Sequence, residues 1–251
     1  MSQNLLILGG TTEATALCHV LAEQGRCGTV SFAGRVDRPV RQPLPQRIGG
    51  FGGADGLVDH IRAEGITHLI DATHPFAAQM SRNAVAAAGS AGIPMIALTR
   101  APWSPKPGDR WQSVADISAA VTALQRPAAR VMLAVGRMHL EVFAPNPQHF
   151  YLLRLVDPPR AALPFPDAHV LVSRGPFTAD EDRALMERYR IDLVVSKNAG
   201  GTGAYAKIEA ARSIGIPVIM IDRPAMPRRA EAHSVEDVVR WLDHADTDLG
   251  V

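Results

Sequence analysis

Short apolar runs alternate with longer amphipathic segments along most of the chain, which is the pattern of strands separated by helices. In the first hundred residues this pattern predicts strands at 4–8, 29–33, 67–71 and 94–98 and helices at 12–24, 54–64 and 76–91. Strands that alternate with helices form a parallel sheet covered on both faces. The first hundred residues therefore predict a doubly wound, Rossmann-like α/β lobe.

A proline-rich segment, "TRAPWSPKPGDRW", interrupts this pattern. Proline continues neither a helix interior nor a strand ladder, so we place a domain boundary after Arg100. The alternation then resumes, with strands predicted at 130–135, 149–155, 169–173, 192–195 and 217–221 and helices at 179–189, 203–214 and 235–244. We predict two Rossmann-like lobes with mainly parallel sheets, 1–100 and 101–251, and a ligand cleft between them.

The two predicted lobes also resemble each other in sequence. "THLIDATHPFAAQM" and "IDLVVSKNAGGTGAY" are each followed by a helix, by Gly-Ile-Pro and by a strand. This repeat favours two similar lobes. The alternative is that Gly-Ile-Pro merely ends a helix and begins a strand, as it does in any α/β protein.

Composition and charge narrow the class of protein. Hydrophobic residues make up 47% of the chain, and 26 basic residues face 25 acidic ones, so a folded protein with no global attraction to nucleic acid or membrane lipid is expected. Cys18 and Cys27 form no CxxC pair and suggest reduced thiols. We find no targeting or membrane-spanning pattern and expect a cytoplasmic protein.

The first strand continues into the first helix through "GGTTEA", a degenerate form of the dinucleotide-binding glycine turn. Gly9 and Gly10 permit a tight turn and close backbone approach, and the helix directs free N–H groups at a phosphate. Thr11 and Thr12 add hydroxyl donors. Glu13 would repel a phosphate, so we expect it to face the ribose or a first-turn N–H group. The alternative is a turn that binds nothing.

An arginine follows the second predicted strand, in "AGRVDR". A site specific for NADH usually carries an acidic residue there, which binds the ribose hydroxyl. Arg35, helped by Arg38, instead suits the 2′-phosphate of NADPH. The alternative is a solvated loop arginine.

The segment "LIDATHPFA" places polar residues at the end of another strand. Thr73 and His74, followed by Pro75 in the first turn of the next helix, are expected to contact the nicotinamide or its ribose. His74 is also a candidate general acid, because histidine titrates near neutral pH. Against this, a single histidine more often caps a helix or packs in the core.

Basic and glycine-rich loops in the second lobe predict a site for an acidic ligand. "SKNAGGTGAY" is not a Walker loop, because its lysine precedes the glycines, but it offers a lysine, an amide side chain and free backbone N–H groups. "AVGRMH" and "VSRGPF" put arginines at two neighbouring strand ends, and the boundary segment adds an arginine and a tryptophan. Each arginine alone is more often a surface residue. The candidates are Arg100, Trp103, Gly136, Arg137, Arg174, Gly175, Lys197, Asn198, Gly200 and Gly201.

Signatures of other chemistries are missing from the sequence. We find no GxSxG, no HExxH, no paired-cysteine zinc pattern and no aromatic-plus-basic stripe, and we predict neither a metal nor a nucleic-acid partner. Short-chain dehydrogenases share the glycine turn but use a Tyr-x-x-x-Lys pair. None of Tyr151, Tyr189 and Tyr205 has a lysine four residues later, which argues against that class.

These segments together, "ILGGTTEA", "AGR", "GGFGG", "DATHPFA", "RAPW", "VGR", "SRGPF" and "SKNAGG", resemble the precorrin-6A reductases of cobalamin biosynthesis, the precorrin-6x reductase family. The resemblance implies two Rossmann-like lobes and an NADPH-dependent reductase that transfers hydride to a double bond of precorrin-6A, an anionic tetrapyrrole, to give precorrin-6B. It adds Gly52 and Gly53 to the expected cofactor-binding residues. The carboxylates of such a substrate fit the predicted Arg and Lys cluster.

Several points stay open at the level of sequence. Another NADPH-dependent reductase of an acidic substrate is one alternative, and a non-catalytic dinucleotide sensor with a protein partner is another. The family serves both metal-free and cobalt-bearing substrates. No indispensable base is expected, and the proton has three candidate sources: solvent, His74 and a substrate carboxylate. The place in a pathway allows a transient hand-over to other enzymes of cobalamin biosynthesis.

Overall fold

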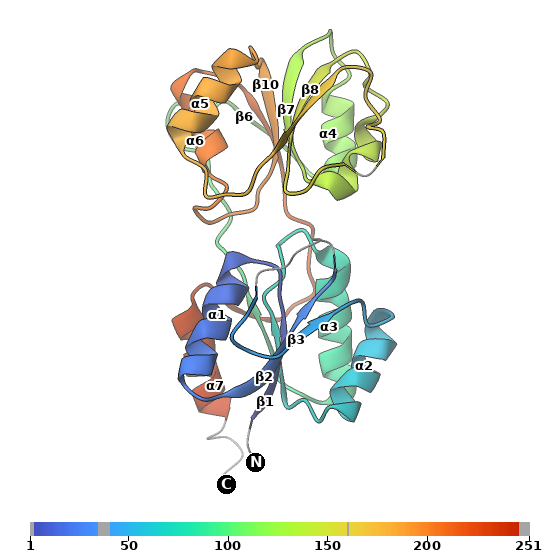
Figure 1. The fold of residues 1–251 in the computed structure, drawn as a ribbon, viewed down its shortest axis with the longest axis vertical. Coiled ribbons are helices and arrows are strands. Elements are labelled where there is room, and N and C mark those ends of the chain that lie inside the picture. The colour runs from blue at the N-terminus through green and yellow to red at the C-terminus, as the bar shows by residue number, and fades with distance from the viewer. Residues whose placement is uncertain (1–2, 35–40, 160, 246–251) are drawn as a thin grey trace. The chain divides into compact units, whose positions relative to one another are not determined.

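The computed structural model describes residues 3–34, 41–159 and 161–245, and the chain divides into two compact units (Figure 1). The first unit contains residues 1–100 and 225–251, and the second contains residues 101–224. The expected second lobe, 101–251, is therefore too long at its C-terminal end. From Ala225 onward the chain belongs to the first unit.

The first unit is built on a parallel sheet with the strand order β12-β5-β4-β1-β2-β3. The order reverses between β1 and β4, as in a Rossmann fold, where ligands bind at the carboxyl ends of these two strands. The strands are β1 (Asn4–Leu8), β2 (Cys27–Phe32), β3 (Gln46–Ile48), β4 (His68–Asp71), β5 (Met95–Leu98) and β12 (Ala230–Ala232).

Helices cover both faces of this sheet (Figure 1). Alternating side chains of β1 explain the two layers: Leu5 and Ile7 pack in the cluster formed with α1 (Thr12–Glu23) and α7 (Val235–Ala245), whereas Leu6 and Leu8 pack in the cluster formed with α2 and α3. The latter two helices are α2 (Gly53–Ala63) and α3 (Ala78–Ala91). All four β1 side chains are buried. A strand buried on both faces is the continuous apolar run from which β1 was predicted.

The second unit repeats this design with the order β6-β11-β10-β7-β8-β9, again all parallel. Helices α5 and α6 pack on one face, and α4 lies on the other (Figure 1). The strands are β6 (Trp111–Val114), β7 (Arg130–Ala134), β8 (Phe150–Leu155), β9 (Ala168–Val172), β10 (Leu193–Lys197) and β11 (Val218–Ile221). The helices are α4 (Ile117–Ala123), α5 (Ala179–Arg188) and α6 (Ala206–Ser213), with short 3₁₀ turns at Arg137–His139 and Glu141–Phe143.

In each sheet, one edge strand pairs with a strand that is distant from it in the chain. In the first sheet it is β12, which follows the whole second unit, and in the second sheet it is β6, which precedes the other five strands. β12 pairs with β5 through Ala230↔Ile96, and the Thr99 N–H donates to the Ala232 carbonyl at 2.9 Å. This pairing satisfies the open edge of β5, which is the physical reason why the last segment joins the first unit.

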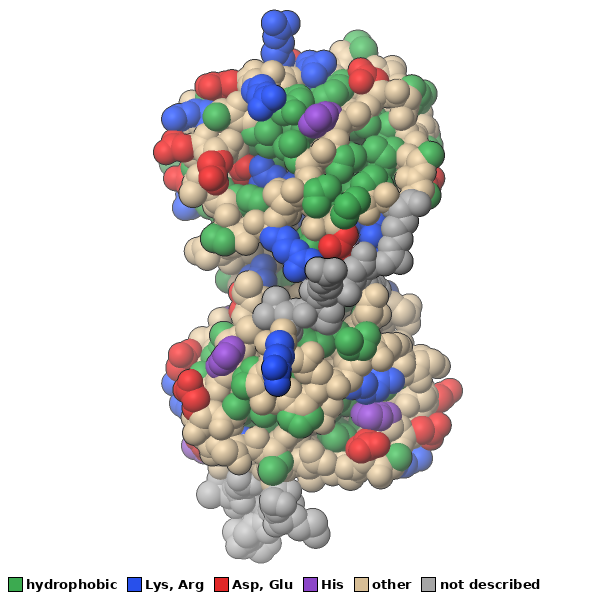
Figure 2. Space-filling view, viewed as in Figure 1, with side chains coloured by type: hydrophobic (Ala, Val, Ile, Leu, Met, Phe, Trp, Pro, Cys, Tyr) green, Lys and Arg blue, Asp and Glu red, His purple; other side chains and the backbone are tan. Residues whose placement is uncertain are grey.

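Side chains of every kind share the surface. On the face shown in Figure 2, apolar side chains gather on the second unit, whereas basic and acidic side chains occur on both units. Over the described ranges, none of the helices has the length and apolarity needed to cross a membrane.

Candidate functional site

The glycine turn after β1 and the loop after β4 lie side by side and are joined by Thr11. Its hydroxyl oxygen accepts a hydrogen bond from the Ala14 N–H at 3.1 Å, which caps α1, and donates to the carbonyl of Ala72 at 2.8 Å. The Ala72 N–H in turn donates to the Leu8 carbonyl at 2.9 Å. Two segments that were predicted separately to bind a dinucleotide therefore form one surface, at the reversal of strand order.

Glycine is required at both positions of the turn, for different reasons. A Cβ on Gly9 would lie 2.9 Å from Val30 Cγ2, which is too close. Gly10 has φ +125°, and no atom lies within 4 Å of the place where its Cβ would be. There is thus open space in front of Gly10, at the N-terminal end of α1. A phosphate fits this arrangement, because the first turn of a helix supplies N–H groups without intrahelical acceptors.

Arg100 belongs to this turn and not to the second unit, where it was expected to bind substrate. Its guanidinium donates to both carboxylate oxygens of Glu13, at 2.7 and 2.5 Å, and to the Thr12 hydroxyl at 3.4 Å. Burial by itself raises the pKa of Glu13, but hydrogen bonds and the charge of Arg100 outweigh this, so the pKa lies below its ordinary value. Arg100 therefore neutralises the one acidic group in the turn.

The loop after β4 is ordered by Asp71, whose side chain is 2% exposed. One carboxylate oxygen accepts from the N–H and the hydroxyl of Thr73, at 3.1 and 2.6 Å, and the other accepts from Arg229 at 2.9 Å. Arg229 was not among the predicted residues. It lies in the segment that returns from the second unit, beside a second arginine, and the sequence signal for it is only that a buried carboxylate needs a cationic partner.

His74 is half-buried and participates in the same loop. Its Nδ1 accepts from the Phe76 N–H at 3.2 Å, and its carbonyl accepts from the Ala77 N–H at 2.7 Å. A neutral His74 therefore carries its ring proton on Nε2. Pro75 follows it, and α3 begins only at Ala78, two residues after the predicted start.

The "GGFGG" segment lies at the start of α2, where Gly52 and Gly53 have φ +83° and +101°. Arg47 orders the preceding residues: its guanidinium donates to the carbonyls of Gly49 and Gly50, both at 2.7 Å, and lies 3.9 Å from the ring centre of Phe51. Arg35 and Arg38, the predicted 2′-phosphate ligands, lie outside the described residues.

The predicted cationic residues of the second unit are spread over several strand ends. Arg137 follows β7 and Arg174 follows β9, but β8 lies between these strands, so the two ends are not neighbours as expected. Arg174 forms an ion pair with Asp157 at 3.3 Å. Lys197 ends β10, which does pair with β7. Gly136 has φ +78°, and Gly175 precedes a cis bond to Pro176.

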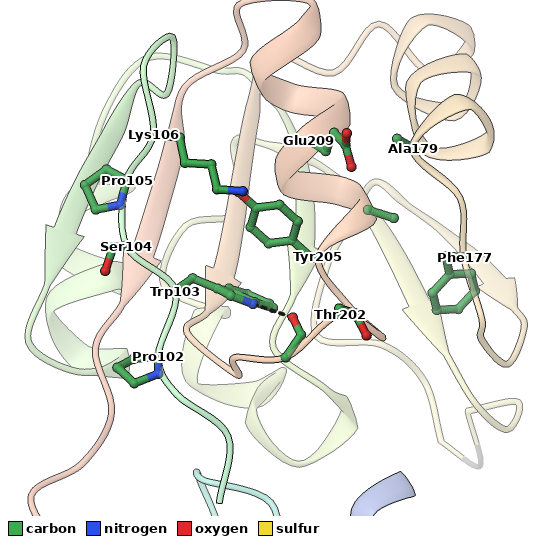
Figure 3. A pocket seen from close by; sticks show the side chains of 12 residues that line it. Pro102, Trp103, Ser104, Pro105, Lys106, Phe177, Ala179, Thr202, Tyr205 and Glu209 are labelled. Carbon is green, nitrogen blue, oxygen red and sulfur yellow. Dashed lines mark hydrogen bonds between the residues drawn. The ribbon is translucent and has the colours of Figure 1, made fainter. Parts of the chain in front are cut away.

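The second unit also contains a pocket of about 540 Å³, shown in Figure 3. The linker that follows Arg100, the loop before α5 and the start of α6 form its walls. Of the predicted substrate-binding residues, Trp103 and Gly201 line it. The other residues that line the pocket are Pro102, Ser104, Pro105, Lys106, Phe177, Ala179, Thr202, Tyr205, Ala206 and Glu209.

Asn198 fixes Trp103 at the wall of this pocket. The side-chain amide of Asn198 accepts from the Trp103 N–H at 2.7 Å and donates to its carbonyl at 2.9 Å. The indole N–H donates to the Gly201 carbonyl at 2.6 Å (Figure 3). Arg223 closes the arrangement by donating to the carbonyls of Asn198 and Ala199, at 2.9 and 3.1 Å. Asn198 thus supports the tryptophan.

The side chains expected of a metal site are not gathered anywhere in the described ranges: no group of three or more His, Cys, Asp or Glu residues lies close enough to hold an ion. Cys18 is buried, and Cys27 is exposed.

Known proteins are similar to this chain over nearly its whole length. Residues 4–243 match the family model described as "Precorrin-6x reductase CbiJ/CobK". The precorrin-6A reductase of Rhodobacter capsulatus is 57% identical over 248 residues, 98% of this chain and 99% of that protein. The precorrin-6A reductase of Rhodococcus erythropolis is 47% identical over 243 residues, 95% and 96% of the two chains.

A cobalt-precorrin-6A reductase, from Priestia megaterium, is 30% identical over 250 residues, 95% of this chain and 97% of that protein. Among solved structures, "CobK precorrin-6A reductase" matches with a TM-score of 0.93 and 56% identity, and the match covers 96% of each chain. The two-sheet α/β fold is therefore shared with that structure.

Proposed function

The chain belongs to the precorrin-6x reductase family, and on that premise we propose that it reduces precorrin-6A to precorrin-6B with NADPH. Family membership makes it a reductase of cobalamin biosynthesis. The observation that carries the cofactor proposal is the Thr11 bridge, because it joins the phosphate-type turn to the loop after β4. In Rossmann folds the pyrophosphate and the nicotinamide end of the cofactor occupy these two places.

Different residues of the first unit are assigned to different parts of NADPH. Gly9, Gly10 and the first turn of α1 receive the pyrophosphate, with Thr12 as a further donor. Arg100 prevents Glu13 from repelling it. Thr73, His74 and Pro75 are assigned to the nicotinamide and its ribose, and Gly52 and Gly53 to a further part of the cofactor.

When bound, NADPH supplies a hydride, and the reduction needs one proton besides. His74 is our candidate to deliver that proton as an imidazolium ion: Nδ1 must then carry a proton itself and release the Phe76 N–H, so that Nε2 can lose its proton and leave a neutral ring. A His74→Gln variant should then lose about a hundredfold or more in kcat with little change in either KM. An unchanged kcat would assign the proton to solvent or to a substrate carboxylate.

The carboxylates of the macrocycle are assigned to the second unit, whose strand ends carry Arg137, Arg174 and Lys197. Gly136, Gly175 and Gly200 shape the same loops. Arginine binds carboxylates in bidentate fashion, which suits a substrate with acidic side chains around its rim. Positioning against the hydride donor, and exclusion of water, are the main tasks of these residues.

We further propose that the natural substrate is metal-free. The relatives named precorrin-6A reductase are 40–57% identical to this chain, whereas those named cobalt-precorrin-6A reductase are 27–31% identical. The two free cysteines suit a reducing compartment, which supports a cytoplasmic enzyme. There the product can pass directly to the next enzyme of the pathway.

The test is an anaerobic assay that follows loss of the NADPH absorbance band with precorrin-6A, beside cobalt-precorrin-6A and beside NADH. We expect turnover with NADPH and precorrin-6A. Arg35→Ala should raise the KM for NADPH by about tenfold or more and leave the KM for NADH unchanged, because only NADPH carries the 2′-phosphate. Arg41→Ala, an exposed arginine nearby in sequence, is the matched control.

Two other outcomes would each replace the proposal. Turnover only with the cobalt-bearing substrate would show that the enzyme is a cobalt-precorrin-6A reductase. Binding of NADPH without oxidation in the presence of either substrate would favour the dinucleotide-sensor alternative.

A further inference from the structure

Each aromatic wall of the pocket in the second unit has a cationic side chain packed against it. Lys106 Nζ lies 5.0 Å from the ring centre of Tyr205, and the Arg154 guanidinium lies 4.0 Å from that of Phe177. Trp103 and Tyr205 also contact each other, with ring centres 5.4 Å apart. Two of the aromatic side chains that line the pocket are thus each in contact with a cation, of which Arg154 is itself paired with Asp182.

Lys207 supplies the charge behind Trp103. Its Nζ lies 5.2 Å from the indole centre and donates to the Ala204 carbonyl at 2.5 Å, and the residue is only 8% exposed. Burial lowers its pKa to about 8, although the nearby Asp182 carboxylate raises it. Lys207 and Arg154 are not among the residues that line the pocket, so they contact the aromatic rings from outside it.

Lys106 differs from these two because it lines the pocket (Figure 3). Within the described ranges it forms no ion pair with a carboxylate, whereas Arg154 pairs with Asp182 and Arg212 pairs with Asp109. Its ammonium group is therefore available to an anion from outside.

Glu209 adds a negative charge to the pocket, on the side opposite in chain origin to Lys106. It lines the same pocket from α6, whereas Lys106 comes from the linker (Figure 3). A ligand carboxylate is repelled by Glu209 and attracted by Lys106, so it binds on the linker side. The rigid indole of Trp103 then offers its face to a conjugated ring, at little entropic cost.

We propose that this pocket binds one carboxylate-bearing pyrrole edge of the tetrapyrrole substrate, stacked on Trp103 and Tyr205 with its carboxylate at Lys106. This inference rests on the proposed function. The volume of about 540 Å³ is that of a small-molecule pocket. Only an edge of the macrocycle enters it, because the double bond that is reduced must remain accessible to the hydride donor.

The experiment measures steady-state KM and kcat for precorrin-6A and for NADPH in Lys106→Met, Lys106→Glu and wild type. We expect Lys106→Met to raise the KM for precorrin-6A by about threefold to tenfold, with kcat and the KM for NADPH unchanged. Lys106→Glu should raise it further, and added salt should reduce the difference between wild type and Lys106→Met. Lys106 lies on the exposed linker, so both variants should fold, which thermal unfolding checks.

Arg126→Met is the matched control, since Arg126 is an exposed cation at the end of α4 whose Nε donates to the Ala123 carbonyl. It should leave kcat and both KM values unchanged. An unchanged KM for precorrin-6A in both Lys106 variants, with wild type active, would overturn the inference and leave the proposed function standing. A raised KM for NADPH instead would assign the pocket to the cofactor and also overturn it. If wild type does not reduce precorrin-6A at all, the proposed function fails, and the inference fails with it.

Discussion

Asp71 and Arg229 form an ion pair at 2.9 Å in which the two side chains are only 2% and 10% exposed. The pair joins the loop after β4 to the segment that leads into β12, two parts of the first unit separated by the whole second unit along the chain. Asp71 also holds Thr73, so the position of the proposed nicotinamide loop depends on a residue from the C-terminal segment.

Replacing Arg229 by methionine leaves the buried Asp71 carboxylate without its cation. Loss of one partner of a buried pair costs about 3–5 kcal/mol, so the free energy of unfolding in urea should fall by about that amount. The KM for NADPH should rise as well, because Thr73 loses its support. Arg229→Lys restores the charge and should recover part of both losses, whereas equal losses in both variants would mean that the charge is irrelevant.

Thr11 has two hydrogen bonds through one hydroxyl, to Ala14 and Ala72. Thr11→Val removes both at constant shape and should lower the free energy of unfolding by about 1–2 kcal/mol, as loss of a helix cap does. It should also weaken NADPH binding, measured by calorimetry. Thr11→Ser keeps the hydroxyl and is the control; if serine weakens NADPH binding as much as valine does, the methyl group and not the bridge is responsible.

The pair of Glu13 and Arg100 should make stability depend on pH. The pKa of Glu13 lies below its ordinary value of 4.5, so its contribution is complete above about pH 4.5 and is lost as the pH falls through the lowered pKa. Urea unfolding of wild type and of Glu13→Gln, measured from pH 7 down to pH 3, should therefore converge at the acidic end. In an Arg100→Met background the same substitution should show much less dependence on pH. A constant difference at every pH would contradict this.

Lys207 predicts a dependence of the same sign, but in alkaline solution and from an unfavourable contribution. Its pKa is lowered from 10.5 to about 8, so the unfolded chain binds more protons between these values and the free energy of unfolding rises with pH there. At pH 7 the buried charge is unfavourable, and Lys207→Met should increase the free energy of unfolding by about 1–3 kcal/mol. The advantage of the variant should shrink above about pH 8. If it stays constant up to about pH 10, Lys207 titrates like an exposed lysine.

The two thiols should differ in reactivity. Burial raises the pKa of Cys18 to about 11, and the residue is 0% exposed, whereas Cys27 is exposed. A disulfide reagent such as Ellman's should modify one thiol of the native protein and the second only after unfolding. Cys27→Ser should abolish the native reaction. Modification of both thiols in the native state would show that α1 opens readily.

Most helices and strands were predictable because their apolar runs are long. β1 is Leu-Leu-Ile-Leu after an asparagine, and β10 and β11 are similar. The missed strands β3, β6 and β12 lack such runs, and β12 is only Ala-Glu-Ala. Three residues of this kind form a strand because β5 offers an open edge, and that is a tertiary effect that no local pattern contains.

In the candidate site too, features that depend on local sequence were predictable, and features that depend on tertiary contacts were not. Gly9, Gly10 and Thr11 were predictable because turn and cap chemistry is local. The pairing of Arg100 was not predicted because its partner, Glu13, is 87 residues away, and Arg229 was missed because Asp71 is 158 residues away. Sequence shows that a charge is present, but the fold decides which opposite charge it meets.

The late position of β12 in the chain also decides when each unit is completed during synthesis. The second unit lies within one continuous stretch and has all its strands once residue 224 has been made, whereas the first unit must wait for β12 and α7. Until then β5 is an open sheet edge, and the face of the sheet that α1 covers lacks its second helix, α7. The usual order, in which the N-terminal domain matures first on the ribosome, is therefore reversed: the part made first is finished last.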